Sequence, residues 1–318
     1  MRILLTGAAG FVGHHVARHL EESGHEVIAM VRMNKIGDAN RLREIGFQGE
    51  QVWHDLASPI VGTVASRLGT VDAVVHLAGE THVDRSIVDP AAFALANVVG
   101  TTNLLVWAEK HCHDGRFLQF STDEVFGPAP CDKRFSEDEA HNPRNPYAAS
   151  KSGAEAMVQA FRNTYGFQTT IVRSMNIFGE RQHREKFVPM CIRKILAGQM
   201  IRVHADPTCT IAGSRFYIHA GNVARGITFV LEHGEDGPYH LVGEREVDNA
   251  QMLEEIAGII GKSASYQLVN FHSSRPGHDL RYALADNRLR ALGWRIPQTF
   301  EESLTRTVRW YLEHREWL

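Results

Sequence analysis

Two carboxylates stand side by side where a buried strand is expected to end. The apolar run 117–121 reads as a strand, and Thr122, Asp123 and Glu124 follow it directly. Neighbouring carboxylates can divide into one protonated acid and one ionised base, because burial and like-charge repulsion push their pKa values apart. Successive strand residues point to opposite faces, so both side chains reach one ligand only if the chain turns after Thr122. The alternative is a pair of solvated loop carboxylates.

A glycine-rich turn near the N-terminus predicts a phosphate-binding loop. The stretch Leu5-Thr-Gly-Ala-Ala-Gly-Phe-Val-Gly13 follows the first expected strand and opens a helix. Gly7 permits a tight turn, Gly10 lets backbone amides approach a pyrophosphate, and Gly13 lets the helix pack close to the sheet. The helix N-terminus then faces the phosphates with its partial positive charge. The alternative is a glycine turn with a purely structural role.

A tyrosine and a lysine form the third group. Tyr147 and Lys151 are four residues apart in the expected helix 147–165, so they share one helix face. A tyrosine with a pKa of ~10 acts as a base near neutral pH only if its phenolate is stabilised by about 4 kcal/mol. The Lys151 ammonium and a bound nicotinamide ring are suitable sources of positive charge, and Lys151 can also hold the nicotinamide ribose. The spacing is common by chance, but together with Thr122 and the glycine turn it forms a constellation.

The end of the second strand bears on the choice of dinucleotide. An acidic residue there binds the adenosine ribose hydroxyls and favours NAD, but this strand ends in Val31 and Arg32. An arginine can neutralise a 2′-phosphate, so the sequence favours NADP over NAD, unless Arg32 is only a solvated strand-end charge. Asp55 is expected at the adenine edge. The further positions expected to line the cofactor are Phe11, Val12, Leu56, Leu77, Ala78 and Gly79.

Short apolar runs alternate with longer amphipathic ones, which predicts an α/β fold with a doubly wound parallel sheet of Rossmann type. The expected strands are 2–5, 26–31, 51–54, 73–77, 117–121 and 169–173, separated by helices 11–23, 91–111 and 147–165. After about residue 175 the rhythm loosens, with helices expected over 187–197, 220–232, 249–260 and 301–314. We expect a nucleotide-binding domain over 1–175, to which some later segments return, and a smaller substrate-binding lobe over 176–318.

Composition and charge exclude several classes of protein. The 318 residues are 43% hydrophobic and 22% charged, which is ordinary for a globular protein. The net charge of −3 predicts no nucleic-acid partner, and no apolar run approaches the ~20 residues of a membrane span. The N-terminus enters a strand at once, so we expect a cytoplasmic protein. The 18 histidines and four cysteines show no metal-binding or disulfide spacing, which predicts no metal and reduced thiols.

Nearly the whole chain resembles the extended short-chain dehydrogenase/reductase family, and within it the dTDP-glucose 4,6-dehydratases. The resemblance rests on His76-Leu-Ala-Gly-Glu-Thr-His-Val-Asp-Arg-Ser-Ile87, Asn97-Val-Val-Gly-Thr101, Ser121-Thr-Asp-Glu-Val125, Asn145-Pro-Tyr-Ala-Ala-Ser-Lys151, Glu185-Lys-Phe-Val-Pro189 and Arg275-Pro-Gly-His-Asp279. The Thr-Asp-Glu triplet is the specific part, because relatives that only epimerise typically carry small residues there. The resemblance implies a lyase of deoxysugar biosynthesis that acts on a nucleotide-diphosphate hexose.

The resemblance also assigns roles. Tyr147 takes the proton from the sugar O4 while hydride leaves C4, and Thr122 hydrogen-bonds the reacting oxygen. The resulting 4-ketone acidifies the C5 proton, which Glu124 removes while Asp123 protonates the C6 hydroxyl. Hydride then returns to C6 and gives a 4-keto-6-deoxy sugar. Two alternatives are a 4-epimerase of similar fold and a catalytically silent dinucleotide sensor or scaffold, although an intact set of Thr122, Tyr147 and Lys151 argues against the latter.

For the later half of the chain the resemblance implies contacts to the nucleotide diphosphate, each with a plain surface residue as its alternative. The residues are Asn176, Lys186, Arg215 and Arg275. His82 and Arg85 are expected near the sugar, and Asn97 is expected to bond backbone or water near the tyrosine. A homodimer is expected through the helices 91–111 and 147–165.

Three departures from the family's pattern leave the nucleotide open. Val31 and Arg32 replace the acidic strand end. The segment 204–215 lacks the usual glycine-rich loop, and 216–222 lacks the acidic residues expected there. These positions bear on recognition of the nucleotide and its base, so dTDP, UDP, CDP and GDP sugars remain alternatives.

Overall fold

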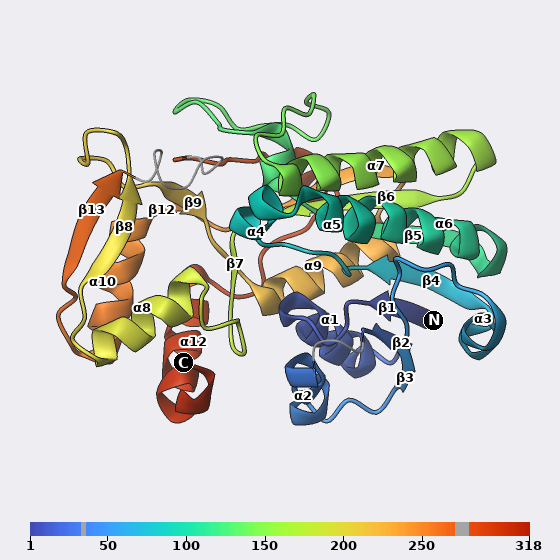
Figure 1. Cartoon of the computed structure of the whole chain (residues 1–318), viewed down its shortest axis with the longest axis horizontal. Coiled ribbons are helices and arrows are strands. Elements are labelled where there is room, and N and C mark those ends of the chain that lie inside the picture. The colour runs from blue at the N-terminus through green and yellow to red at the C-terminus, as the bar shows by residue number, and fades with distance from the viewer. Residues whose placement is uncertain (33–35, 271–279) are drawn as a thin grey trace.

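A seven-stranded parallel sheet in the order β11-β6-β5-β4-β1-β2-β3 forms the centre of the molecule (Figure 1). The computed structural model describes residues 1–32, 36–270 and 280–318, without the side chains of 36–39 and 113–114. The strands are β1 (Arg2–Thr6), β2 (Glu26–Val31), β3 (Glu50–Trp53), β4 (Val71–His76), β5 (Cys112–Thr122), β6 (Thr169–Ser174) and β11 (Gly237–Leu241). This order reverses between β1 and β4, so the predicted doubly wound fold is confirmed.

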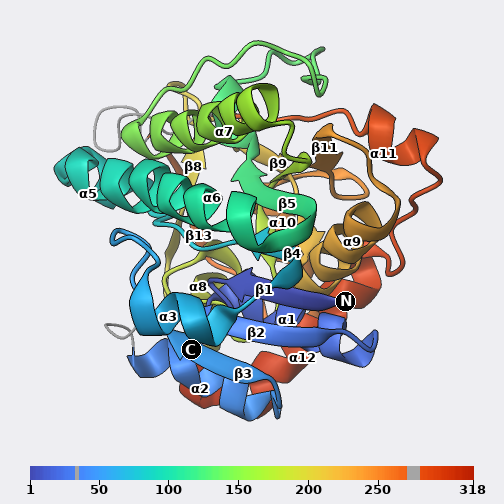
Figure 2. The same cartoon turned by 90° about the vertical axis from the view of Figure 1, so that its right-hand side faces the viewer.

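Helices cover both faces of the sheet (Figure 2). Ile3 and Leu5 of β1 pack with residues of α1 (Phe11–Glu22) and α9 (Ala220–His233), whereas Leu4 packs on the opposite face with α6 (Gly100–His111) and α7 (Pro146–Tyr165). Such a sheet needs strands that are apolar at consecutive positions. The short helices α2 (Ile36–Glu44), α3 (Gly62–Leu68), α4 (Val83–Val88) and α11 (Asn287–Ala291) complete this part.

One long helix combines three elements. α5 (Pro90–Ala94) continues through a π-helical turn (Leu95–Val99) into α6, so that residues Pro90–His111 form a single helix of 22 residues. By length and composition it could cross a membrane, with a mean hydropathy of 1.5, contrary to the expectation that no apolar segment is long enough. Its buried residues, among them Leu104, Leu105 and Trp107, belong to the core between the sheet and α7. It is a core helix of this fold.

The later part of the chain divides between two places. Helix α9 and strand β11 return to the sheet, where β11 pairs with β6. The remaining elements form a smaller lobe at the left of Figure 1 around a separate core. They are α8 (Phe187–Leu196), α10 (Asn249–Ile260), α12 (Phe300–Glu313), a terminal 3₁₀ turn (Arg315–Trp317), and the strand pairs β7 (Ile177–Phe178) with β10 (Ile218–His219), β8 (Ile201–Ala205) with β13 (Tyr266–Asn270), and β9 (Ser214–Phe216) with β12 (Glu246–Asp248).

Candidate active site

The chain turns immediately after Thr122, which removes the geometric objection to a paired acid and base. A 3₁₀ turn (Asp123–Phe126) begins where β5 ends. Thr122 caps this turn, because its Oγ1 accepts a hydrogen bond from the backbone N–H of Glu124 at 3.3 Å. The same hydroxyl donates to Oδ1 of Asp123 at 3.0 Å. The local sequence therefore places both carboxylates beside one threonine.

Asp123 has the environment of a general acid. Its side chain is buried, and Oδ2 has no hydrogen-bond partner within the part of the chain that the structure describes. Burial raises the pKa of Asp123 to about 6, although the charge of Arg215 and the hydrogen bond from Thr122 act in the opposite direction. With this pKa about a tenth of the carboxyl is protonated at pH 7, and a larger share at lower pH, so Asp123 can act as a proton donor.

Glu124 is held by the residue that also begins α7. Asn145 Nδ2 donates to Glu124 Oε2 at 3.0 Å, while Asn145 Oδ1 accepts from the backbone N–H of Ala148 at 2.8 Å as the N-cap. One asparagine therefore positions the expected base and the helix of the tyrosine. The sequence motifs do not by themselves assign a role to Asn145, although an asparagine followed by Pro146 at the first helical position is a typical helix start.

Tyr147 and Lys151 are both buried on α7, facing the end of β5. The Tyr147 phenol hydrogen-bonds Thr122, and burial raises its pKa above the usual value, with Glu124 and then Asp123 adding to the increase. Lys151 Nζ donates to the Phe120 carbonyl at 2.7 Å. Burial lowers the pKa of Lys151 to about 8, against the opposing charge of Glu155. The phenol therefore lies among the three residues of the turn, and the lysine ties α7 to the strand that carries them.

The glycine turn fits the pyrophosphate of a dinucleotide. Gly7 has a φ of +70°, and a Cβ on it would lie 2.7 Å from the backbone nitrogen of Ala78. A Cβ on Gly13 would lie 2.0 Å from the Gly7 carbonyl oxygen. The first hydrogen bond of α1 runs from His14 N to Gly10 O at 3.1 Å, so the amides of the preceding first turn, which includes Phe11 and Val12, face outward from the helix N-terminus.

Arg32 does not lie free at the end of β2. Its Nη2 donates to Oε1 of Glu80 at 2.6 Å, and Glu80 follows the Leu77–Gly79 segment after β4. Glu80 belongs to the motif His76–Ile87, which does not by itself assign it a role. Asp55 is exposed and accepts the Ala57 N–H at 3.0 Å. Leu56 is buried against the long helix, beside Gly100.

Asn97 fastens the segment after β4 to the catalytic helix. Its side chain accepts the N–H of Glu80 at 2.8 Å and donates to the Glu80 carbonyl at 3.0 Å and to Ser150 Oγ at 2.8 Å. Ser150 Oγ in turn donates to the Tyr147 carbonyl at 2.7 Å. The predicted backbone tie of Asn97 is confirmed, and it lies in the π-helical turn of the long helix.

Two of the predicted diphosphate ligands lie close to the paired carboxylates. Arg215, on β9, contributes a positive charge that lowers the pKa of Asp123, and its guanidinium lies 4.7 Å from the centre of the Tyr282 ring. The charge of Glu124 acts on Lys186, whose pKa is lowered mainly by desolvation. The Lys186 side chain is exposed, so its charge is available to a ligand at the mouth of the site.

The other predicted substrate residues differ in their exposure. Arg85 is exposed and lies 3.6 Å from Glu185, while His82 is half-buried and the charges of Lys186 and Arg85 add to the desolvation that lowers its pKa. Asn176 has an exposed side chain, and its carbonyl accepts the N–H of Ile218. Arg275 lies outside the described residues.

The unusual segment 204–215 includes a closed turn around Asp206. Oδ1 of Asp206 accepts the N–H groups of Thr210 and Ile211, each at 2.8 Å, and the Asp206 N–H donates to the Ile211 carbonyl at 2.9 Å. The turn is followed by β9, which carries Arg215.

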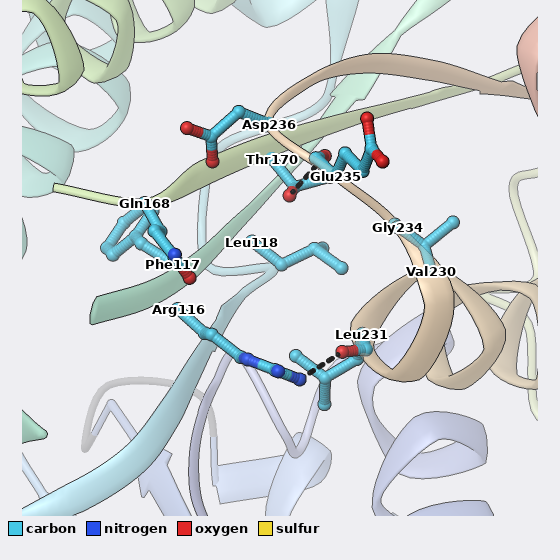
Figure 3. A pocket seen from close by; sticks show the side chains of 10 residues that line it. All are labelled: Arg116, Phe117, Leu118, Gln168, Thr170, Val230, Leu231, Gly234, Glu235 and Asp236. Atoms are coloured by element: carbon cyan, nitrogen blue, oxygen red, sulfur yellow. Dashed lines mark hydrogen bonds between the residues drawn. The ribbon is translucent and has the colours of Figure 1, made fainter. Parts of the chain in front are cut away.

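An open cavity of about 470 Å³ lies away from all of these groups (Figure 3). It is formed where β6 begins and α9 ends, between Arg116, Thr170, Leu231 and Asp236. Arg116 Nη1 donates to the Leu231 carbonyl at 2.9 Å at its edge. Thr122, Asp123, Glu124, Tyr147 and Lys151 do not line this cavity. We therefore place the active site at the opposite ends of the strands, where β1, β4 and β5 end.

Comparison with known proteins establishes the family of the chain. Residues 3–243 match the family model described as the NAD dependent epimerase/dehydratase family. The chain belongs to this family. Among relatives of this epimerase/dehydratase chain, a dTDP-glucose 4,6-dehydratase of Escherichia coli is 33% identical over 348 residues, covering 100% of this chain and 95% of the relative.

Solved structures of epimerase/dehydratase proteins share the fold. The dTDP-glucose 4,6-dehydratase DesIV from Streptomyces venezuelae, with NAD bound, is 35% identical with a TM-score of 0.89, covering 100% of this chain and 98% of that one. A UDP-glucose 4-epimerase of Thermus thermophilus, also in complex with NAD, is 27% identical with a TM-score of 0.86, covering 98% and 99%. The fold alone therefore does not separate dehydration from epimerisation.

The expected preference for NADP gains no support. The solved relatives named above contain NAD. The physical reason for an NADP preference was an arginine with an available charge, and Arg32 is instead paired with Glu80. The family establishes a nicotinamide dinucleotide as the cofactor class.

Proposed function

We propose that this chain is a nucleotide-sugar 4,6-dehydratase that converts a nucleoside-diphosphate hexose into its 4-keto-6-deoxy derivative. The observation that supports this proposal most strongly is the turn at Thr122, which holds Asp123 and Glu124 beside the Tyr147 phenol. An epimerase that only oxidises and reduces C4 has no use for an adjacent acid and base. Elimination of water requires both.

The residues act in a defined order. Tyr147 takes the proton of the sugar O4, with Thr122 bonded to the reacting oxygen. Burial raises the pKa of this phenol, so base action requires the positive charge that a bound nicotinamide ring would supply beside it. A dinucleotide held by the glycine turn and Lys151 would supply the acceptor for the C4 hydride and the donor that returns it to C6. Glu124, oriented by Asn145, removes the C5 proton once C4 is a ketone. Asp123, whose pKa of about 6 keeps part of it protonated, gives its proton to the departing C6 hydroxyl.

We infer NAD as the cofactor and propose that it stays bound through the cycle. The glycine turn and the N-terminus of α1 hold its pyrophosphate. Lys151 holds the nicotinamide ribose from its position against Phe120. Because hydride leaves and returns within one turnover, the net reaction consumes no oxidant or reductant.

We propose that Lys186 and Arg215 bind the substrate diphosphate. Both lie close enough to the paired carboxylates to interact electrostatically with them, and both match a phosphate in charge. The names of the relatives make dTDP-glucose the first substrate to test.

We propose a homodimer formed through the long helix and α7. The outward face of the long helix carries apolar residues that this chain leaves exposed: Val88 just before it, and then Leu95, Val99 and Val106. A stripe of this kind is typical of an interface. Sedimentation should give a dimer, and Val99→Glu together with Val106→Glu should give a monomer. A monomeric wild-type protein would contradict the dimer.

Mass spectrometry of the products tests the reaction. The purified protein is incubated with dTDP-glucose, UDP-glucose, CDP-glucose or GDP-mannose. We expect loss of one water from at least one of them, whereas a C4 epimer keeps the mass of its substrate. Asp123→Asn and Glu124→Gln should each lower the rate of water loss by roughly 100-fold or more. Glu22→Gln, an exposed charge on α1, is the matched control and should leave the rate unchanged.

Two outcomes would replace the proposal. Epimers without water loss would make the protein a 4-epimerase. Binding of dinucleotide without turnover of any sugar would favour the sensor or scaffold.

A further inference from the structure

Arg32 and Glu80 form an ion pair beyond the carboxyl end of β1. The register of the sheet sets Met30 of β2 and His76 of β4 level with Thr6 of β1. Arg32 lies two residues beyond Met30, and Glu80 lies four residues beyond His76. Because β2 and β4 flank β1, their ends are about 10 Å apart. The ion pair therefore spans the point where Gly7 begins the phosphate-binding turn.

The pair is held in place from both sides. The backbone of Glu80 is fixed by its two hydrogen bonds with the Asn97 side chain. The contact with Arg32 is a charge-assisted hydrogen bond of 2.6 Å. The side chains are 31% and 23% exposed, compared with 47% and 41% for the Arg67–Glu50 pair near the amino end of β3. The Arg32–Glu80 pair is thus partly shielded from water, which strengthens its electrostatic effect on a ligand.

We propose that Glu80 sets the cofactor preference of this enzyme: by pairing with Arg32 it neutralises a strand-end cation suited to a 2′-phosphate and adds a negative charge beside it. An acidic residue at the end of β2 normally rejects the 2′-phosphate and binds the ribose. In this chain the carboxylate comes from the segment after β4 instead. The inference rests on the proposed dinucleotide-dependent function, and it explains how NAD is compatible with an arginine at position 32.

Titration of dinucleotide-free protein tests the proposal. Dissociation constants for NAD and NADP are measured by calorimetry for the wild type, Glu80→Gln, Arg32→Ala and the double variant. Glu80→Gln keeps the backbone bonds to Asn97 and removes only the charge. We expect it to shift the ratio of the two constants toward NADP by about tenfold. Arg32→Ala in the Glu80→Gln background should reverse that gain, because the gain depends on the freed guanidinium.

Controls separate the possible causes. Glu50→Gln removes the same charge from a comparable pair near the amino end of β3 and should leave the ratio unchanged. Melting temperatures verify that each variant is folded. NAD binding with an unchanged ratio in Glu80→Gln would overturn the inference and leave the proposed function standing. A shift that persists in the double variant would also overturn it. A wild-type protein that binds neither dinucleotide would overturn the proposed function and this inference together.

Discussion

Two buried carboxylates near α7 have opposite environments. Glu155 is 3% exposed and Asp123 is 5% exposed, so water solvates neither. Burial by itself would raise the pKa of both carboxyl groups. At Glu155 a hydrogen bond from His141 and the charge of Arg173 outweigh burial and lower the pKa to about 2. At Asp123 burial prevails and the pKa rises to about 6.

The difference lies in the hydrogen-bond partners. Three contacts join Arg173 to Glu155, from Nε to both oxygens at 3.1 and 3.0 Å and from Nη2 to Oε2 at 2.7 Å. Asp123 receives one side-chain hydrogen bond, from Thr122, while Oδ2 has no partner among the described residues. A fully paired buried carboxylate serves the fold, whereas a partly paired one is poised to exchange a proton. The two regions interact electrostatically, because the charge of Glu155 acts to raise the pKa of Lys151 one turn earlier on α7.

The largest effect is expected from breaking the paired site. Glu155→Gln leaves the guanidinium of Arg173 buried without its counter-charge, which we expect to lower the free energy of unfolding by about 3–5 kcal/mol. The pKa of Glu155 is lowered in the folded state, so its contribution is present above the ordinary value of 4.5 and is lost as the pH falls toward 2. Chemical unfolding at pH 7.5 and at pH 4 should therefore show a smaller loss at pH 4.

An exposed pair provides the control for that experiment. Arg18 and Glu22 on α1 are in contact at 2.7 Å, with side chains 60% and 56% exposed. Glu22→Gln should change stability by less than about 0.5 kcal/mol, because solvent screens the pair. Equal losses in Glu22→Gln and Glu155→Gln would contradict the importance of burial. Arg173→Met combined with Glu155→Gln should recover part of the loss, since it removes the stranded charge.

The opposite result is expected at the partly paired site. Asp123→Asn removes a charge that the folded protein holds at a cost, and the shift from 3.8 to about 6 corresponds to about 3 kcal/mol. Because the folded-state pKa is raised, the stability due to protonation is complete below about pH 4 and is lost as the pH rises through 6. Asp123→Asn should thus stabilise the protein at pH 7.5 and leave it nearly unchanged at pH 4. A destabilised variant at pH 7.5 would show that Asp123 is structural.

Much of this contrast was not accessible from the sequence. The motifs predicted the Thr122, Tyr147 and Lys151 set, because the strand, the glycine turn and the helix spacing are local patterns. The strand pattern does not specify the turn after Thr122, although a threonine followed by two acidic residues is a good helix start. The Arg173–Glu155 and Arg32–Glu80 pairs join segments 18 and 48 residues apart, and residue spacing alone does not specify such contacts.

Strand β11 shows the same limit in the fold. The segment Gly237–Leu241 contains a proline and a histidine, so it lacks the apolar run that identified the other strands. It lies at the edge of the sheet, where a proline is tolerated. Its pairing with β6 across more than 60 residues depends on α9 returning to the sheet, and no local signal specifies that return.

The smallest effect on stability is expected at Asn145, where capping of α7 and orientation of Glu124 can be tested separately. Asn145→Ala removes the N-cap of α7 and the donor to Glu124. It should lower the free energy of unfolding by about 1 kcal/mol and should also lower the activity. Asn145→Asp is the sharper variant, because aspartate is an equally good N-cap but replaces the amide donor with a second carboxylate facing Glu124. We expect a melting temperature near that of the wild type and a kcat about tenfold lower. Full activity in Asn145→Asp would show that Glu124 needs no orienting donor, and a large loss of stability would show that the cap does not explain the role of Asn145.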